Sequence, residues 1–343
     1  MKQVPFVYDI NVQKILSNIL SPLEEKIPVF GRKKRVIVIA GPTGSGKSEL
    51  GVELSKILGG EVLSADSCQV YQGMDIGTAK LTPQEMGGIP HHLIDIRKID
   101  EPFNVMEFYE EATRKLSEVS ARGHVPILVG GSGFYLHVLL YGPPKGPASN
   151  PQVRKKIEEQ MDRLGVEVLY ERLQMLDPEY AKTVTERDKH KIVRALEIIT
   201  LSRRKVSDFP KPKAIENSEY DFRCFFLYYP LPILYLKIEK RCDQMIEKGF
   251  IEEVKRLQYN GISKNPLASQ AIGYKQCLYY LHSEQKEEDL QIFLQEFKRA
   301  SRNYAKRQFT WFRKEPFFRF LNLDELGIDR VKEIVLSDFE QGY

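Results

Sequence analysis

The residue types with the clearest chemical meaning lie at positions 41–48, where the chain reads Gly-Pro-Thr-Gly-Ser-Gly-Lys-Ser. Glycines at the first, fourth and sixth places permit backbone angles that turn successive N–H groups inward around anionic oxygens. Lys47 adds a mobile positive charge, and the Ser48 hydroxyl is placed to hold a Mg²⁺ ion that bridges phosphate oxygens. All eight residues are therefore predicted to bind a diphosphate or a nucleotide: Gly41, Pro42, Thr43, Gly44, Ser45, Gly46, Lys47 and Ser48.

Two aspartates are candidates for the acidic group that such a phosphate site needs. Asp66 follows Leu63-Ser64-Ala65, and Asp95 follows Leu93-Ile94. Asp66 has three possible roles, as a proton acceptor, a magnesium ligand or a helix cap. Asp95 stands at a predicted strand end, where an isolated aspartate usually belongs to a turn.

Alternating strands and helices must position these groups. Apolar runs predict strands over 36–40, 61–65, 92–96 and 126–129, and amphipathic spacing predicts helices over 47–58 and 104–123. The fold class is therefore α/β, a P-loop core with a mostly parallel sheet covered by helices on both faces. The phosphate loop, Asp66 and the glycine turn at 130 then share the carboxyl edge of the sheet, where ligands gather.

The second half of the chain changes character after Gly142. Residues 150–205 carry only helical signals and predict an all-helical insertion domain, after which a strand over 222–229 returns to the sheet. One long helix is predicted from about 232 to 259 and a last one from about 287 to 313. The predicted organisation is a leader and linker (1–34), the first part of the core (35–147), the insertion (148–215), the return to the core (216–320) and a C-terminal tail (321–343).

Composition excludes several classes of protein. The chain has 343 residues, 42% hydrophobic and 29% charged, as expected for a globular protein with two lobes. Its four cysteines form no Cys-x-x-Cys pair, and its apolar runs are too short to cross a membrane. With a net charge of +4, any nucleic-acid contact must come from local clusters of Lys and Arg. We expect a cytoplasmic monomer without membrane contact.

Several motifs together resemble the tRNA dimethylallyltransferase family, also called the IPP transferase family. The resemblance covers about residues 36–315 and rests on the phosphate loop and on these blocks in the family's order: Asp66–Lys80, Pro90–Leu93, Leu128–Tyr135, Arg194–Glu197, Ala271–Lys275 and Ala305–Trp311. It implies an enzyme that transfers a dimethylallyl group from dimethylallyl diphosphate to N6 of the adenosine on the 3′ side of the anticodon, releasing diphosphate. The implied partners are the anticodon stem-loop of tRNA and dimethylallyl diphosphate.

The resemblance also implies roles for individual residues. Asp66 becomes the proton acceptor, while Lys47 and Arg302 stabilise charge on the departing diphosphate. The residues implied in tRNA binding come from the core, the insertion and the last helix: Asp66, Ser67, Cys68, Gln69, Ser132, Arg154, His190, Lys191, Ile192, Val193, Arg194, Gln270, Gly273, Tyr274, Lys275, Lys306, Arg307 and Arg313. Gln69 and Ser67 are placed to read the edge of an extruded base.

The chain departs from the family pattern at three places. Ser132 replaces the usual threonine, Arg187-Asp188 replaces Asn-Asp ahead of a basic helix, and the leader, with a helical apolar pattern around Ile15, has no counterpart. Two other enzymes stay open as alternatives, a small-molecule kinase or ATPase and a prenyltransferase that acts on free adenine nucleotides. A lid with arginines would favour the first, whereas the long basic insertion argues against the second.

Overall fold

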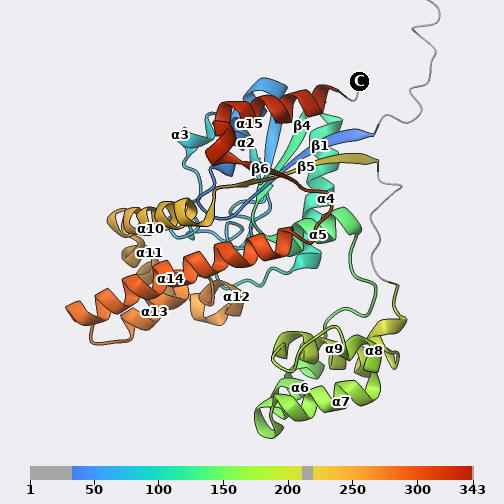
Figure 1. Ribbon diagram of the computed structural model, residues 1–343. Helices are drawn as coiled ribbons and strands as arrows, with labels where there is room; N and C mark the ends of the chain where they lie inside the picture. Colours follow the sequence, from blue (N-terminus) through green and yellow to red (C-terminus); the bar gives the residue numbers. More distant parts are fainter. Residues whose placement is uncertain (1–32, 211–218, 342–343) are drawn as a thin grey trace, which may run out of the picture.

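A parallel sheet forms the centre of the computed structural model, which describes residues 33–210 and 219–341 (Figure 1). The strand order is β3-β2-β4-β1-β5-β6, and every neighbouring pair is parallel. Buried Val and Ile alternate along β1 on both faces, as in a strand covered on both sides. The strands are β1 Lys34–Ala40, β2 Gly60–Ser64, β3 His91–His92, β4 Val125–Gly130, β5 Tyr220–Tyr228 and β6 Arg319–Asn322.

Helices cover both faces of this sheet, which confirms the predicted α/β class. Ile37 and Ile39 of β1 pack with Leu50 of α2 (Lys47–Leu58) and Val335 of α15 (Leu323–Glu340) on one face. The other face packs against α4 (Val105–Ala121), α5 (Gly133–Tyr141), α10 (Leu231–Glu247) and α14 (Glu287–Phe312). A capping box of Asn104 and Glu107 begins α4.

Four helices between β4 and β5 surround a hydrophobic core of their own, built on residues such as Leu173 and Ile192. They are α6 (Pro151–Leu164), α7 (Val166–Leu176), α8 (Pro178–Ala181) and α9 (Lys189–Ser202), followed by a 3-10 turn, η1 (Val206–Asp208). Figure 1 shows this helical group below the sheet and apart from it.

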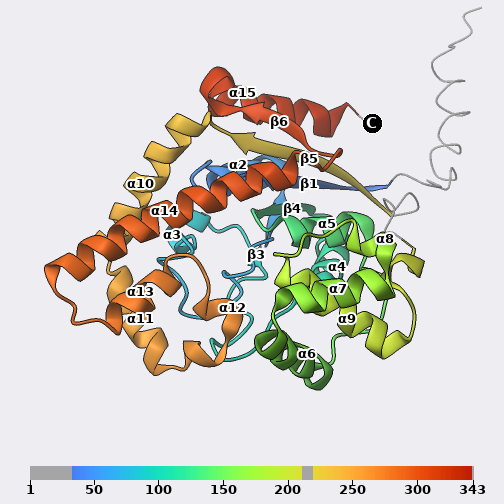
Figure 2. The same cartoon turned by 60° about the horizontal axis from the view of Figure 1, so that its bottom comes forward.

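The return segment adds a second helical layer beside the sheet. It holds α10, α11 (Phe250–Tyr259), η2 (Ile262–Lys264), α12 (Pro266–Ser269), α13 (Tyr274–Leu281) and α14. In Figures 1 and 2 the long helix α14 runs from beside α13 to the helices that cover the sheet. The predicted strand over 222–229 and the predicted last helix are confirmed by β5 and α14.

Three expectations about elements were wrong. The strand predicted over 92–96 ends at His92, because Leu93 and Asp95 have φ angles of 64° and 55°, which turn the chain out of the sheet. The single helix predicted over 232–259 is two helices, separated at Gly249 with φ 91°. Residues beyond 320, expected to be a tail, complete β6 and form α15.

The helix predicted in the leader lies outside the described residues. A short helix, α3 (Pro83–Met86), joins β2 to β3 and carries a capping box of Thr82 and Glu85. No helix in residues 33–210 and 219–341 has the length and apolar character needed to cross a membrane.

Candidate active site

The phosphate loop connects β1 to α2 and has the backbone that its glycines predict. Gly44 and Gly46 have φ angles of 80° and 79°, a left-handed conformation that glycine adopts without steric cost. A Cβ atom on Gly41 would lie 2.6 Å from the Leu227 carbonyl oxygen, so a larger residue does not fit there. No side chain caps the first turn of α2, and its N–H groups are therefore available to an anion.

One buried polar side-chain atom of this loop has no hydrogen-bond partner among the described residues. The Ser45 hydroxyl is buried and makes no hydrogen bond within the described part of the chain. Buried polar groups normally find a partner, and exceptions call for an explanation such as a bound ion or ligand. An oxygen of a bound phosphate would supply that partner.

Two half-buried cations lie beside the loop. The Lys47 ammonium donates to the Pro42 carbonyl oxygen at 3.3 Å. Burial and then the charge of Arg241 lower the pKa of Lys47 to about 8, while the nearby Asp66 opposes this effect. The pKa of Arg241 is itself lowered by burial, and Asp66 again opposes the change.

Arg241, on α10, was not among the residues predicted from the sequence. Within residues 33–210 and 219–341 it makes neither a hydrogen bond nor an ion pair, although its surroundings are desolvated. A desolvated cation without a partner is costly, and an anionic ligand would remove the cost. Arg241 is therefore a candidate to stabilise a diphosphate together with Lys47.

Arg302, the basic residue expected from the resemblance, has a different environment. Its guanidinium forms an ion pair with Glu239, which also lies on α10. A catalytic role for Arg302 would require it to leave Glu239 when substrates bind, so the role stays a prediction.

Asp66 lies just beyond β2, at the same edge of the sheet. Its Oδ1 atom accepts hydrogen bonds from the backbone N–H groups of Cys68 at 2.8 Å and Gln69 at 3.3 Å. Among the described residues no hydrogen bond engages Oδ2, which is therefore free to accept a proton.

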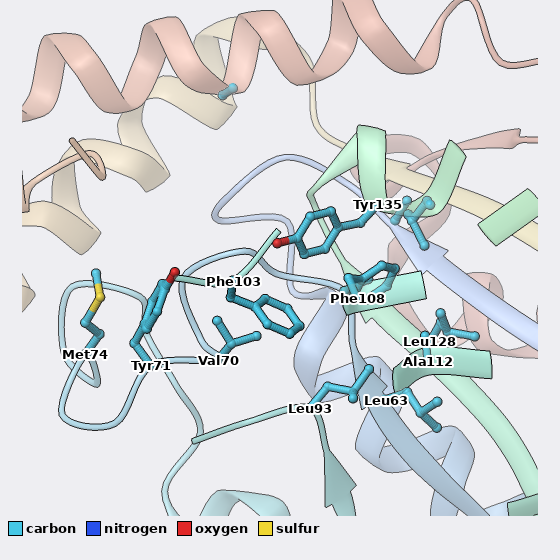
Figure 3. Close-up of a cluster of buried hydrophobic side chains, with 14 of the residues drawn as sticks. Leu63, Val70, Tyr71, Met74, Leu93, Phe103, Phe108, Ala112, Leu128 and Tyr135 are labelled. Carbon is cyan, nitrogen blue, oxygen red and sulfur yellow. The ribbon is translucent and has the colours of Figure 1, made fainter. Parts of the chain in front are cut away.

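The turn after β4 is fixed against the Asp66 segment. The Ser67 N–H donates to the Ser132 hydroxyl at 3.0 Å, and the Ser132 N–H donates to the Ala65 carbonyl oxygen at 3.2 Å. A Cβ atom on Gly130 would lie 2.2 Å from that carbonyl oxygen, which explains the glycine. Ser132 thus provides the hydroxyl that the family's threonine would offer. The loop that follows Asp66 packs through Val70, Tyr71 and Met74 into the apolar cluster of Figure 3.

Gln308 of α14 joins the two halves of the site and was missed as a site residue. Its side-chain oxygen accepts from the Thr43 N–H at 3.2 Å, and its amide nitrogen donates to the Gly131 carbonyl oxygen at 2.9 Å. The phosphate loop and the turn after β4 are held to each other through this buried side chain. The only sequence signal was its place inside the Ala305–Trp311 block.

The polar side chains predicted to bind tRNA outside the Asp66 and Ser132 segments fall into three groups. Lys306 and Arg307 line an open groove of about 390 Å³ on α14 with Asn303, Thr310, Trp311 and Lys314. The exposed residues are His190, Lys191, Gln270 and Arg313. Arg313 directly follows the last turn of α14. Arg154, Arg194 and Lys275 are half-buried.

Four of the predicted tRNA residues have no side-chain surface to offer. Ile192 and Val193 pack into the core of the insertion. Tyr274 is buried, and a Cβ atom on Gly273 would lie 2.7 Å from the Phe297 ring. A contact of these four residues with RNA would therefore run through their backbone groups, and it stays a prediction.

Asp95 is the acidic residue that a kinase or ATPase would need, but in this structure it forms an ion pair away from the phosphate loop. Its carboxylate forms an ion pair with Lys80 at 2.6 Å, and Lys80 also binds Asp75 and the Tyr71 carbonyl oxygen. This arrangement fixes the loop between β2 and β3.

Comparison with known proteins gives a consistent result. A family model described as IPP transferase matches residues 69–315. A tRNA dimethylallyltransferase from Protochlamydia amoebophila is 53% identical over 331 residues, 96% of each chain, and one from Chlamydia pneumoniae is 44% identical over 93% of each chain. A tRNA isopentenylpyrophosphate transferase structure from Bacillus halodurans has a TM-score of 0.66 at 37% identity, covering 91% of this chain and 96% of that one. A structure of a eukaryotic dimethylallyltransferase acting on tRNA has a TM-score of 0.74 at 28% identity, covering 90% and 80%.

Proposed function

Because this chain belongs to the IPP transferase family, we propose that it transfers a dimethylallyl group from dimethylallyl diphosphate to N6 of the adenosine on the 3′ side of the anticodon. It is a prenyltransferase-type enzyme of tRNA modification, and diphosphate is the second product. The observation that carries the proposal is the meeting of an anion-binding loop, two desolvated cations and Asp66 at one edge of the sheet.

The chemistry explains why these groups are needed together. The exocyclic amine of adenine is a weak nucleophile, so the reaction needs a good leaving group and removal of a proton as the new bond forms. The loop N–H groups, Lys47 and Arg241 would stabilise charge that grows on the departing diphosphate. The free Oδ2 of Asp66 would accept the proton of the amine.

We propose Mg²⁺ as the cofactor, with the Ser48 hydroxyl as its protein ligand. Mg²⁺ is commonly held by one or two protein oxygens together with phosphate oxygens and water, and a larger protein cage is not required. The described residues contain no cluster of three or more His, Cys, Asp or Glu side chains that could hold a metal, which fits a metal carried by the diphosphate. When bound, the ion would neutralise phosphate charge.

The anticodon stem-loop is the part of the tRNA that we propose to bind. Exposed cations on α9 and α14 would contact phosphates, and the target base would leave its stack to reach Asp66. We propose that the protein is a monomer and that it works in the cytoplasm.

Mass spectrometry of nucleosides tests the function directly. Unmodified tRNA incubated with the protein, Mg²⁺ and dimethylallyl diphosphate should gain one five-carbon group on a single adenosine, and omission of the diphosphate should abolish the gain. Parallel reactions contain ATP alone or free AMP in place of tRNA. Turnover of ATP without tRNA would favour a kinase or ATPase, and prenylated AMP would favour the enzyme of free nucleotides.

A further inference from the structure

Glu253 on α11 is a buried carboxylate that the reaction scheme does not use. It is 1% exposed and accepts four hydrogen bonds. Three come from successive backbone N–H groups, those of Asp75 at 3.1 Å, Ile76 at 2.7 Å and Gly77 at 3.2 Å. The fourth comes from the Tyr274 hydroxyl at 2.7 Å. Such a set of N–H groups around one carboxylate is a strong, charge-assisted attachment.

The segment that Glu253 holds is also confined sterically. A Cβ atom on Gly77 would lie 2.3 Å from the Phe250 ring and 2.6 Å from the Tyr274 ring. The two rings meet edge to face, with centroids 5.1 Å apart. Burial, reinforced by the charge of Glu253, raises the pKa of Tyr274, so its hydroxyl keeps the proton that it donates.

The held segment leads directly to Gln69. The Gln69 side-chain amide donates to the Thr78 carbonyl oxygen at 3.4 Å, and its oxygen accepts from the Ser64 hydroxyl at 2.8 Å. The Thr78 hydroxyl in turn donates to the Met74 carbonyl oxygen at 2.6 Å. The orientation of Gln69 therefore depends on the position of residues 74–78, and Gln69 adjoins the Asp66 turn through its own N–H group.

We propose that Glu253 is a positioning residue for tRNA: with Tyr274 it fixes residues 75–77, and through Thr78 it sets the orientation in which Gln69 meets the target base. The inference rests on the proposed function, because it assigns the recognition of the base to Gln69. It also gives a reason for two motifs to occur together, since Asp75-Ile76-Gly77 and Tyr274 belong to different blocks of the sequence.

The test compares Glu253→Gln with Glu252→Gln, the exposed neighbour on the same helix. In E253Q an amide NH₂ replaces one acceptor oxygen and faces a backbone N–H group. We expect kcat/KM for tRNA to fall about tenfold to hundredfold, as for small misplacements of a binding group. The KM for dimethylallyl diphosphate should stay within about twofold, because the phosphate loop is a separate element. Glu252→Gln should match the wild-type protein.

A double-mutant cycle with Gln69→Ala separates positioning from general destabilisation. If Glu253 acts through Gln69, the E253Q change should have almost no further effect on kcat/KM for tRNA once Gln69 is alanine. Effects that multiply, or an equal loss of affinity for the diphosphate, would overturn the inference. Tyr274→Phe removes one of the four hydrogen bonds. It should give a smaller fall in kcat/KM for tRNA, which likewise vanishes once Gln69 is alanine, and it replaces E253Q as the test if E253Q does not fold. Failure of the wild-type protein to modify tRNA would instead refute the proposed function.

Discussion

At the scale of single residues, the charges around the phosphate loop suit a ligand that carries more negative charge than any side chain nearby. Lys47 and Arg241 are both desolvated, and Asp66 is the carboxylate whose charge acts on each of them. Asp66 cannot neutralise two cations, and its Oδ1 atom is occupied by backbone N–H groups. A bound diphosphate would balance the cations and leave Asp66 free for proton transfer.

Replacement of Asp66 by asparagine tests the proton-transfer role with little disturbance. The Asn side-chain oxygen can still accept from the N–H groups of Cys68 and Gln69, so the turn should persist. Prenyl transfer at saturating tRNA and diphosphate should fall by about 10² to 10⁴, the usual contribution of a positioned general base. Affinity for tRNA should stay unchanged. Strong recovery of activity at high Mg²⁺ would contradict the assignment and make Asp66 a metal ligand.

The lowered pKa of Lys47 predicts a specific pH dependence. A cation whose pKa is lowered to about 8 is charged below that pH and neutral above it. The value of kcat/KM for dimethylallyl diphosphate should therefore decline as the pH rises through about 8, since this parameter reports groups of the free enzyme. Lys47→Arg keeps its charge and should remove that inflection, even if its activity is lower. An unchanged inflection in the arginine variant would assign the titration to another group.

The sequence revealed the contiguous parts of the site far better than the dispersed ones. The phosphate loop and Asp66 stand in short motifs whose residues are also neighbours in space. Arg241 and Gln308 lie inside long amphipathic helices, where one more polar residue gives no local signal. They reach the site only through the packing of α10 and α14 beside the sheet, which the hydrophobic pattern of one chain does not specify.

At the scale of elements, the insertion combines surface cations with internal ones. Lys191 is exposed, and Arg154 pairs with Glu158 on the same helix. Arg194 has another task, because it donates to the Pro147 carbonyl oxygen and pairs with the buried Glu197, which also binds Ser149 and Asn150. Arg194 and Glu197 thus hold the segment that joins the insertion to the core.

Charge reversal of Arg154 and Lys191 together should weaken tRNA binding without harming the fold. Each lost phosphate contact should lower the slope of log K against log salt by about one. Binding measured at several salt concentrations should therefore show a flatter dependence and nearly normal kcat. Lys182→Glu, also on the insertion but outside the predicted contacts, is the matched control. An unchanged slope would remove these two side chains from the RNA surface.

The elements that the sequence predicted poorly are those whose local pattern is short or interrupted. Strand β6 has only four residues, and α15 contains Gly327 with φ 70°, which disrupts the helical spacing near its start. Val331, Val335 and Phe339 nevertheless recur every four residues and pack on the sheet. The long uninterrupted patterns of α4 and α14 were predicted closely, because periodicity is most reliable over many turns.

At the scale of the whole molecule, the sheet is fastened at the end opposite the active site. Glu61, near the start of β2, is almost fully buried and accepts hydrogen bonds from Arg122 at 2.7 Å, His124 at 2.6 Å and His92 at 2.5 Å. Burial alone would raise the pKa of Glu61, but hydrogen bonds from Arg122, His92 and His124 outweigh it and lower the pKa to about 2. The cluster ties β2, β3 and the segment between α4 and β4 together.

This carboxylate should contribute to stability in a defined pH range. Its folded-state pKa lies below the unfolded value of about 4.3, so its contribution is complete above that pH and disappears as the pH falls towards about 2. Glu61→Gln should lower the free energy of unfolding at pH 7 by about 1.5 to 3 kcal/mol, because it removes the buried carboxylate that accepts the hydrogen bonds of Arg122, His124 and His92. In chemical denaturation, the free energy of unfolding of this variant should fall less on acidification than that of the wild-type protein. Glu110→Gln, an exposed glutamate on α4, should change neither quantity.

The position of β1 between β4 and β5 has a consequence for the order of events during synthesis. On the ribosome, β1 emerges long before its partner, since Lys34 pairs with Tyr220 and the entire insertion is translated between them. At about 5 to 20 residues per second, the insertion can fold around its own core while one edge of β1 still has unpaired N–H and C=O groups. A nascent chain halted after residue 210 should therefore bind chaperones or sediment as aggregate, whereas a chain released after α15 should not. Gln308 is the part of the phosphate site that is translated last. The phosphate loop therefore gains its Gln308 contact, and the enzyme becomes competent, only when translation is nearly finished.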